Sequence, residues 1–220
     1  FKNWIKDSQV RDKYLLEKKI EEKNKIPVLL FEDFNTTGIK GDWNTHEPKL
    51  ADGSRNDYHI FFWYIGSPME KGSEKGGGVG VGRLTFAFSS KINTFFTYTV
   101  QETKKKFFFG MSCLGKSENN PSYDQIARFG IEEKAKDGSD IVIPINDKDE
   151  LETLSDGFKL QRKKDEAGTS MIVPLPTDSI TKKNLIINSI HRYRYAFYND
   201  YINMEVFDKV INRSQIHNTI

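Results

Sequence analysis

A glycine-rich stretch in the middle of the chain constrains the fold most strongly. Five of the eight residues from Gly76 to Arg83 are glycine, the residue type that loses most backbone freedom on folding. The next segment, residues 84–92, places apolar side chains at helical spacing. A glycine loop that enters a helix points several backbone N–H groups outward at the positive end of the helix dipole, where phosphate binds. The stretch therefore predicts a phosphate cradle, with Lys75 and Arg83 adding a cation at each end.

Three alternative interpretations of this stretch were weighed. A flexible linker is rich in glycine and serine and has few apolar residues. Here valine alternates with glycine and an amphipathic segment follows, which argues against a linker. A P-loop ends in Gly-Lys-Ser/Thr after a buried strand, but Arg83-Leu84 follows the last glycine. A dinucleotide fingerprint reads Gly-x-Gly-x-x-Gly, but residues 78–82 read Gly-x-Gly-x-Gly. The phosphate cradle of a different nucleotide-binding class fits best.

Composition limits the class of protein. The chain has 220 residues, of which 37% are hydrophobic and 16 are Phe, enough for one sizeable core. A net charge of +2 indicates no general attraction to nucleic acid or membranes. The single cysteine, Cys113, excludes an intramolecular disulfide, and we interpret it as a small buried hydrophobe. Since no apolar run reaches membrane-spanning length and no signal peptide is visible, we expect a cytoplasmic protein without a membrane partner.

The succession of helical and strand patterns predicts an α+β fold. Helices are expected at residues 2–24, 57–65, 84–92, 147–156 and 177–198. Strands are expected at residues 26–31, 94–100, 106–113, 126–131, 141–145, 157–162, 168–175 and 202–207, the second and third forming a hairpin. We expect a two-layer α/β sandwich whose mixed, mostly antiparallel sheet is covered by helices on one face. Residues 1–176 form the expected domain, and residues 177–220 extend it or begin another.

An acidic residue at the end of the first predicted strand is the second candidate feature. Asp33 follows the apolar run at residues 26–31, and turn-forming residues come directly after it. A carboxylate in such a place can accept a hydrogen bond from an exocyclic amine, such as that of adenine. The alternative is that Asp33 only caps the turn through its side chain.

Three blocks in this order resemble the GHKL ATPases, which include DNA gyrase B, the ninety-kilodalton heat-shock chaperones, MutL-type mismatch-repair proteins and sensor histidine kinases. Residues 33–39 (Asp-Phe-Asn-Thr-Thr-Gly-Ile) are similar to the family's Asp-x-Gly-x-Gly, with one extra residue and with Asn35 near the first glycine position. Residues 77–82 are similar to the glycine-rich lid, and Gly168-Thr169 to the Gly-Thr that opens a strand behind the adenine. The chain looks most like bacterial ATP-binding proteins with an Asp-Phe-x-Thr-x-Gly turn. Those proteins have a lysine at the position that Arg83 occupies in this chain.

The resemblance implies a Bergerat fold that binds ATP and Mg²⁺ between its helices and its sheet. It also implies an ATP-hydrolysing, nucleotide-switched clamp that forms a homodimer on ATP binding and acts in DNA repair or defence against foreign DNA, meeting nucleic acid through another domain. The implied residues on the adenine side are Asp33, Asn35, Thr37, Gly38 and Thr169. Asp33 and Thr169 are expected to share a water molecule. Those on the phosphate side are Lys75, Gly77, Gly78, Val79, Gly80, Val81, Gly82 and Arg83.

The family's Glu-x-x-x-Asn helix, which supplies the general base and the Mg²⁺ ligand, is not found in residues 1–24. Asn3 and Asn24 have no acidic residue four positions earlier, and the usual spacing to Asp33 places the motif before Phe1. The catalytic base and the metal ligand are therefore not assigned, and binding of ATP without hydrolysis stays open. The four histidines lack metal-ligand spacing.

A second class of function is a non-catalytic module that binds a nucleotide or a partner. Lysines at 104–106 followed by phenylalanines at 107–109 combine positive charge with aromatic stacking groups, as single-stranded nucleic-acid sites do. The alternative, which we favour, is a lysine turn that enters a buried strand. A histidine-kinase catalytic domain is a third interpretation, but the chain offers no helix with a phosphate-accepting histidine.

Overall fold

The computed structural model describes residues 25–45, 47–64, 82–114, 125–134, 138 and 140–216. The chain divides into two compact units, Phe1–Pro176 and Thr177–Ile220, which are described separately. The helices of the first unit are α4 (Asp57–Phe62), α5 (Leu84–Phe88) and α6 (Lys148–Phe158). Its strands are β1 (Val28–Glu32), β2 (Thr94–Val100), β3 (Lys106–Cys113), β4 (Ile126–Phe129), β5 (Ile131–Lys134), β6 (Asp140–Ile143) and β7 (Gly168–Pro174).

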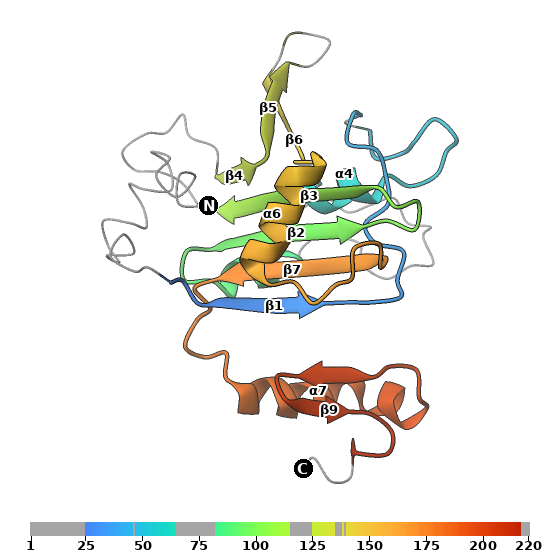
Figure 1. The fold of residues 1–220 in the computed structure, drawn as a ribbon, viewed down its shortest axis with the longest axis vertical. Coiled ribbons are helices and arrows are strands. Elements are labelled where there is room, and N and C mark those ends of the chain that lie inside the picture. Colours follow the sequence, from blue (N-terminus) through green and yellow to red (C-terminus); the bar gives the residue numbers. More distant parts are fainter. Residues whose placement is uncertain are drawn as a thin grey trace. The chain divides into compact units, whose positions relative to one another are not determined.

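A five-stranded sheet with the order β1-β7-β2-β3-β4 forms the centre of the first unit (Figure 1). Each of its pairings is antiparallel, which confirms the expected α+β class and the hairpin of β2 and β3. β7 comes last in sequence but lies between β1 and β2, with Ile172 opposite both Leu30 and Phe96. This insertion brings the Gly-Thr of β7 beside the end of β1.

Helices cover both faces of this sheet, so the expected single covered face is wrong. α4 and α5 pack on one face, where Tyr58, Phe62 and Ala87 join the β2 and β3 side chains Phe95, Phe107, Phe109 and Met111. α6 crosses the other face (Figure 1), where Leu151 joins Phe96, Phe108 and Ile172. All seven residues of β2 and the six central residues of β3 are buried, because both faces of these strands are covered. A one-sided sheet would alternate apolar with polar residues instead.

The short helices differ from the periodicity expected of them. α5 ends at Phe88, which is 59% exposed, and Ile92 is buried in the turn that follows. α4 ends at Phe62 rather than at residue 65, and its buried residues are Tyr58 and Phe62. In both cases six or fewer helical residues are too few for a 3.6-residue stripe to fix which face is buried.

Two strand predictions are also wrong. The segment 157–162 is not a strand, because α6 continues to Phe158 and ends at Lys159, whose left-handed backbone (φ 58°) forms the C-cap. The strand expected at 126–131 is divided between β4 and β5, and β5 forms a separate two-stranded hairpin with β6. The expected N-terminal helix at residues 2–24 lies outside the described residues.

The second unit consists of α7 (Lys182–Tyr198) and a hairpin of β8 (Met204–Val206) with β9 (Lys209–Ile211). Thr181 caps α7, its hydroxyl accepting a hydrogen bond from the Asn184 N–H at 3.1 Å, so the helix starts later than expected. The single strand expected at 202–207 is interrupted by a turn at Phe207 (φ 57°). The unit has its own small hydrophobic core, formed by Ile190, Phe197, Val206, Ile211 and Ile216. Within the described residues, no helix has the length and apolar character needed to cross a membrane.

Candidate nucleotide site

Asp33 lies directly after β1 and is fixed by the first residues of β7. Its N–H donates to the Thr169 carbonyl at 2.9 Å, and its Oδ1 accepts from the Thr169 N–H at 2.8 Å. The Thr36 hydroxyl donates to the same Oδ1 at 2.6 Å. Among the described residues none donates to Oδ2, and the residue is exposed. The two sequence candidates therefore meet, and one oxygen of Asp33 is available to a ligand.

The turn after Asp33 uses two left-handed residues, Asn35 (φ 58°) and Gly38 (φ 65°). Asn adopts this conformation more readily than most residues. Asn35 can therefore form a turn at a place where the Asp-x-Gly-x-Gly pattern has glycine. At Gly38 a Cβ would lie 2.4 Å from the Val100 carbonyl oxygen, so a side chain there is excluded. The Thr37 hydroxyl donates to the Gly38 carbonyl at 3.1 Å. Asn35, Thr37 and Gly38 thus shape the turn beside Asp33.

Three threonines lie on the face of the sheet that α4 and α5 cover. Thr97 and Thr99 on β2 and Thr169 on β7 alternate with residues of the opposite core and are all buried. The Thr99 hydroxyl donates to the Gly168 carbonyl at 3.2 Å, lies 3.3 Å from the Thr169 hydroxyl and accepts from the Ile39 N–H at 3.0 Å. The result is a polar floor next to Asp33 in an otherwise apolar layer. The repeated Thr-x-Thr of β2 is the sequence signal that could have identified it.

Gly168 explains why a Gly-Thr pair stands at this point. Its φ is 140°, and a Cβ would lie 2.3 Å from the Asp33 carbonyl oxygen and 2.6 Å from Oδ1. Only glycine lets β7 approach the end of β1 closely enough for the Thr169 N–H to reach the carboxylate.

Arg162 supports the same strand ends and was missed in the sequence. Its guanidinium donates to the Asp33 carbonyl at 2.5 Å, to the Glu166 carbonyl at 3.1 Å and to the Ser170 hydroxyl at 3.2 Å. Ser170 in turn donates to Glu32 at 2.7 Å. Burial lowers the pKa of Arg162. No motif surrounds this arginine, so only the fold reveals its position.

Most of the glycine-rich stretch, including Lys75, Gly77, Gly78, Val79, Gly80 and Val81, lies outside the described residues. Gly82 is described and exposed, with nothing within 4 Å of the place a Cβ would occupy. α5 follows, and its Phe86 ring lies 5.5 Å from the ring of Phe31 on β1. The exit of the glycine stretch and the strand that carries Asp33 therefore share one core.

Arg83 is turned toward α4. It is 5% exposed, and its terminal nitrogens donate to the carbonyls of Ile60 at 2.6 Å and Tyr64 at 2.5 Å. Burial lowers its pKa to about 10, so the guanidinium is charged at neutral pH. In this arrangement the cation satisfies carbonyls at the C-terminal end of a helix. Its contact with phosphate stays a prediction.

Asp33 and Arg83 lie near opposite ends of the same sheet face. Asp33 bonds to Thr169, which is opposite Thr99, whereas the Arg83 guanidinium lies 5.9 Å from the Phe61 ring, which contacts Phe95. Thr99 and Phe95 are four residues apart on β2, which corresponds to about 13 Å along the strand.

The lysine and phenylalanine run at 104–109 is a turn that enters a buried strand. Phe107, Phe108 and Phe109 are at most 1% exposed. Lys106 pairs with Asp165 at 2.8 Å, and Lys104 donates to the Asp165 carbonyl at 2.9 Å. The favoured interpretation is confirmed, because no ring of this run is open to stack on a base.

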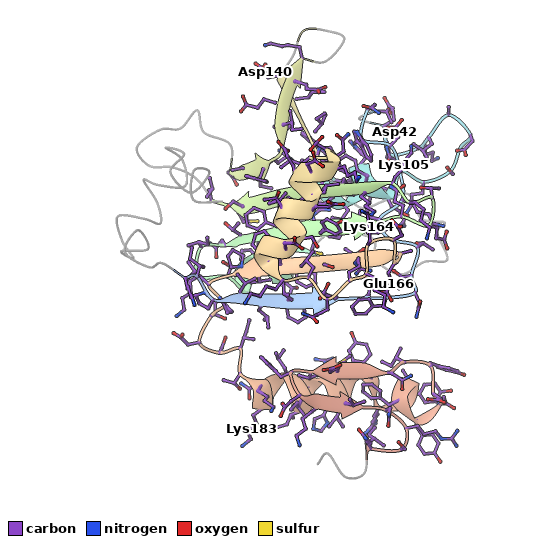
Figure 2. The ribbon with its side chains drawn as sticks, in the orientation of Figure 1. Asp42, Lys105, Asp140, Lys164, Glu166 and Lys183 are labelled. Carbon is purple, nitrogen blue, oxygen red and sulfur yellow. The ribbon has the colours of Figure 1, made fainter. Side chains whose placement is uncertain are left out.

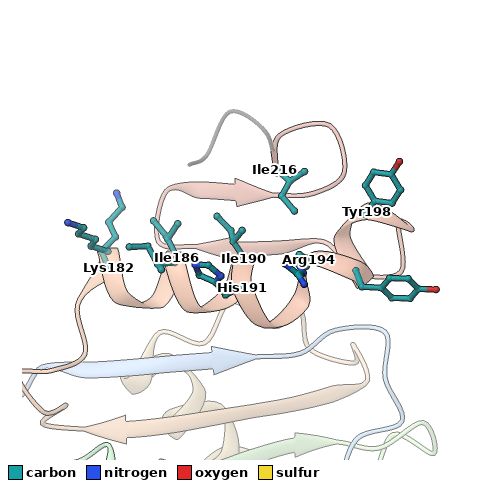
Figure 3. Close-up of a pocket in the computed structure, with 10 residues that line it drawn as sticks. Lys182, Ile186, Ile190, His191, Arg194, Tyr198 and Ile216 are labelled. Carbon is teal, nitrogen blue, oxygen red and sulfur yellow. The ribbon is translucent and has the colours of Figure 1, made fainter.

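A groove of about 970 Å³ lies along α7 in the second unit (Figure 3). Its lining is apolar in the middle, with Ile186, Ile190 and Ile216, and basic along its length, with Lys183 and Arg194. Among the described residues no acidic side chain lines it, and α7 itself contains none. This surface was not predicted.

Comparisons with protein-family models, with curated proteins and with solved structures found no match to this chain. In the described part of the chain no group of three or more His, Cys, Asp and Glu side chains could hold a metal ion.

Proposed function

We propose that this chain binds ATP, as the GHKL ATPases it resembles do, with adenine against Asp33 and phosphates at the glycine-rich stretch. The observation that carries the proposal is the half-satisfied carboxylate of Asp33. Oδ1 is held by the Thr169 N–H at 2.8 Å and the Thr36 hydroxyl at 2.6 Å, while Oδ2 accepts no bond from the described residues. A fixed acceptor of this kind suits the exocyclic amine of adenine, and Thr99 and Thr169 supply polar groups beside it.

The phosphate end of the proposal comes from the sequence. Consecutive backbone N–H groups in a glycine-rich stretch can surround a phosphate, and clustered phosphate charge calls for Mg²⁺. Hydrolysis, closure of the stretch over ATP and dimerisation are further steps of the same proposal, as is a role as a nucleotide-switched clamp in DNA repair or defence against foreign DNA.

Titration with a fluorescent ATP analogue, with and without Mg²⁺, tests the proposal. In Asp33→Asn the amide oxygen keeps the bond from Thr169, so the amide N–H₂ faces the adenine amine, donor against donor. Losing a hydrogen bond to a charged acceptor costs about 1.5–3 kcal/mol, so affinity should fall about tenfold or more. Asp140→Asn is the matched control, because the exposed Asp140 carboxylate pairs with Lys134 on the β5–β6 hairpin and with no other described residue. Absence of binding by the wild type, or equal affinity in Asp33→Asn, would remove the adenine assignment.

A second candidate function, a partner-binding module, is favoured by the α7 groove. Its apolar middle and its cations complement a helix with apolar and acidic faces, a common mode of recognition. A second copy of the groove is excluded as its occupant by like charge, since α7 carries Lys182, Lys183, Arg192 and Arg194 without an acid. We infer that the groove takes an acidic amphipathic helix of another protein.

Fluorescence anisotropy with a synthetic amphipathic Leu/Glu peptide tests this second candidate. The peptide should bind, and Arg194→Glu should weaken it, whereas Lys209→Glu on β9, outside the groove, should not. Preference for a Leu/Lys peptide or for single-stranded DNA over the acidic peptide would contradict it.

A further inference from the structure

A second pocket, of about 660 Å³, lies on the α6-covered side of the sheet in the first unit. β2, the β2–β3 turn, α6 and the segment before β7 contribute to it, and Lys164 lies in that last segment (Figure 2). The pocket opens on the other face of the sheet from the proposed nucleotide site, because Tyr98 at its base belongs to the core that packs on α6, whereas Thr97 and Thr99 alternate with it and lie on the α4 and α5 side. Arg162 borders both, since it lines the pocket and donates to the Asp33 carbonyl.

Positive charge predominates among the side chains of this pocket. The cations are Lys104, Lys106, Lys148, Lys164 and Arg162, and the carboxylates are Glu152, Asp156 and Asp165. Two of the carboxylates are paired, Asp165 with Lys106 and Glu152 with Lys164, each at 2.8 Å. Outside these two ion pairs, three cations (Lys104, Lys148 and Arg162) remain beside one carboxylate (Asp156), so the net charge of the pocket favours an anion.

Tyr98 supplies an unused donor at the base of the pocket. The residue is 6% exposed, and among the described residues its hydroxyl forms no hydrogen bond. Burial raises the pKa of Tyr98, so the hydroxyl keeps its proton at neutral pH and can donate. The hydroxyl oxygen is not one of the fully buried unpaired atoms of the described residues, so it is open to the pocket and can donate to a bound anion.

Lys148 and Arg162 complete the arrangement in different ways. Lys148, in the first turn of α6, has no ion pair among the described residues, so its ammonium can reach a ligand. All three kinds of nitrogen on Arg162 already donate to Ser170, Glu166 and Asp33. These bonds hold the guanidinium in place, so Arg162 contributes a fixed positive charge to the pocket.

We infer that this pocket binds a small phosphorylated molecule, with the Tyr98 hydroxyl and the Lys148 ammonium on its phosphate oxygens. Calorimetric titration with sodium pyrophosphate at constant ionic strength tests it. Wild type should show saturable binding at one site. Tyr98→Phe removes one oxygen only and should weaken binding about tenfold, the loss expected for a hydrogen bond to a charged group. Lys148→Gln, an exposed position that leaves the fold intact, should weaken binding similarly.

Lys134→Gln on the β5–β6 hairpin is the matched control for removal of a lysine and should leave the affinity unchanged. Asp33→Asn should also leave it unchanged, which separates this inference from the proposed function. No binding by the wild type, or equal binding in wild type, Tyr98→Phe and Lys148→Gln, would overturn the assignment.

Discussion

The rings of Phe31 and Phe86 meet edge to face, with their centroids 5.5 Å apart. Phe31 stands two residues before Asp33, and Phe86 stands four residues after Gly82. Their contact joins the strand that ends at the candidate adenine acceptor to the helix that leaves the glycine-rich stretch. Because aromatic contacts of this kind are directional, the packing fixes the position of α5 against β1.

Replacement of Arg83 distinguishes two roles of its guanidinium, which are bonding to the carbonyls beside α4 and binding of phosphate. Arg83→Met would leave the carbonyls of Ile60 and Tyr64 without their donor, which should lower the free energy of unfolding by about 2 kcal/mol. Urea denaturation measures this. Arg55→Met, which breaks an exposed pair with Asp57, should change it by less than about 1 kcal/mol. An unchanged stability together with lost ATP affinity would show that Arg83 serves phosphate instead.

Gly168→Ala should damage the site from a backbone position. The added Cβ would lie 2.3 Å from the Asp33 carbonyl oxygen, at a φ of 140°, so β7 and the end of β1 must separate. We expect a loss of about 1–3 kcal/mol in stability and weaker ATP binding. Gly157→Ala in α6, where no atom lies within 4 Å of the new Cβ, should instead be neutral or stabilising by up to about 1 kcal/mol. Equal effects of the two changes would contradict the close approach.

The Lys106–Asp165 pair should persist into acid. Its hydrogen bond and charge hold the pKa of Asp165 below the ordinary value of 3.8. A carboxyl whose folded pKa is depressed contributes stability above its unfolded pKa, and that contribution is lost as the pH falls through the folded pKa. The carboxyl carbon of Asp165, followed by NMR, should therefore titrate with a midpoint below 3.8. Lys106→Gln should raise the midpoint, and an unshifted midpoint in the wild type would show that the pair does not form in solution.

The sequence predicted the strands better than the short helices, for physical reasons. β2, β3 and β7 are long apolar runs with β-branched and aromatic residues, so their type and approximate bounds were clear. α4 and α5, with six and five residues, are too short for periodicity to show which face is buried. The second helical layer was missed because α6 is largely polar, and Leu151 is its one buried residue.

The candidate site was predicted in part. Asp33 and Thr169 were singled out and lie together, because a carboxylate after a strand and a Gly-Thr before one are local signals. Thr99 and Arg162 come from segments about 66 and 129 residues beyond Asp33 and carry no motif. Their roles depend on the insertion of β7 between β1 and β2, which sequence periodicity does not specify.

The most direct test follows the Thr169 amide, which donates to the acceptor itself. In a ¹⁵N-edited NMR titration with ATP and Mg²⁺, the Thr169 N–H resonance should shift and saturate together with binding. GTP should bind more weakly and shift this resonance less, because guanine has a carbonyl where adenine has its amine. A carbonyl cannot donate a hydrogen bond to the Asp33 carboxylate. A Thr169 resonance that stays in place while ATP saturates the protein, or a protein that does not bind ATP, would contradict the account.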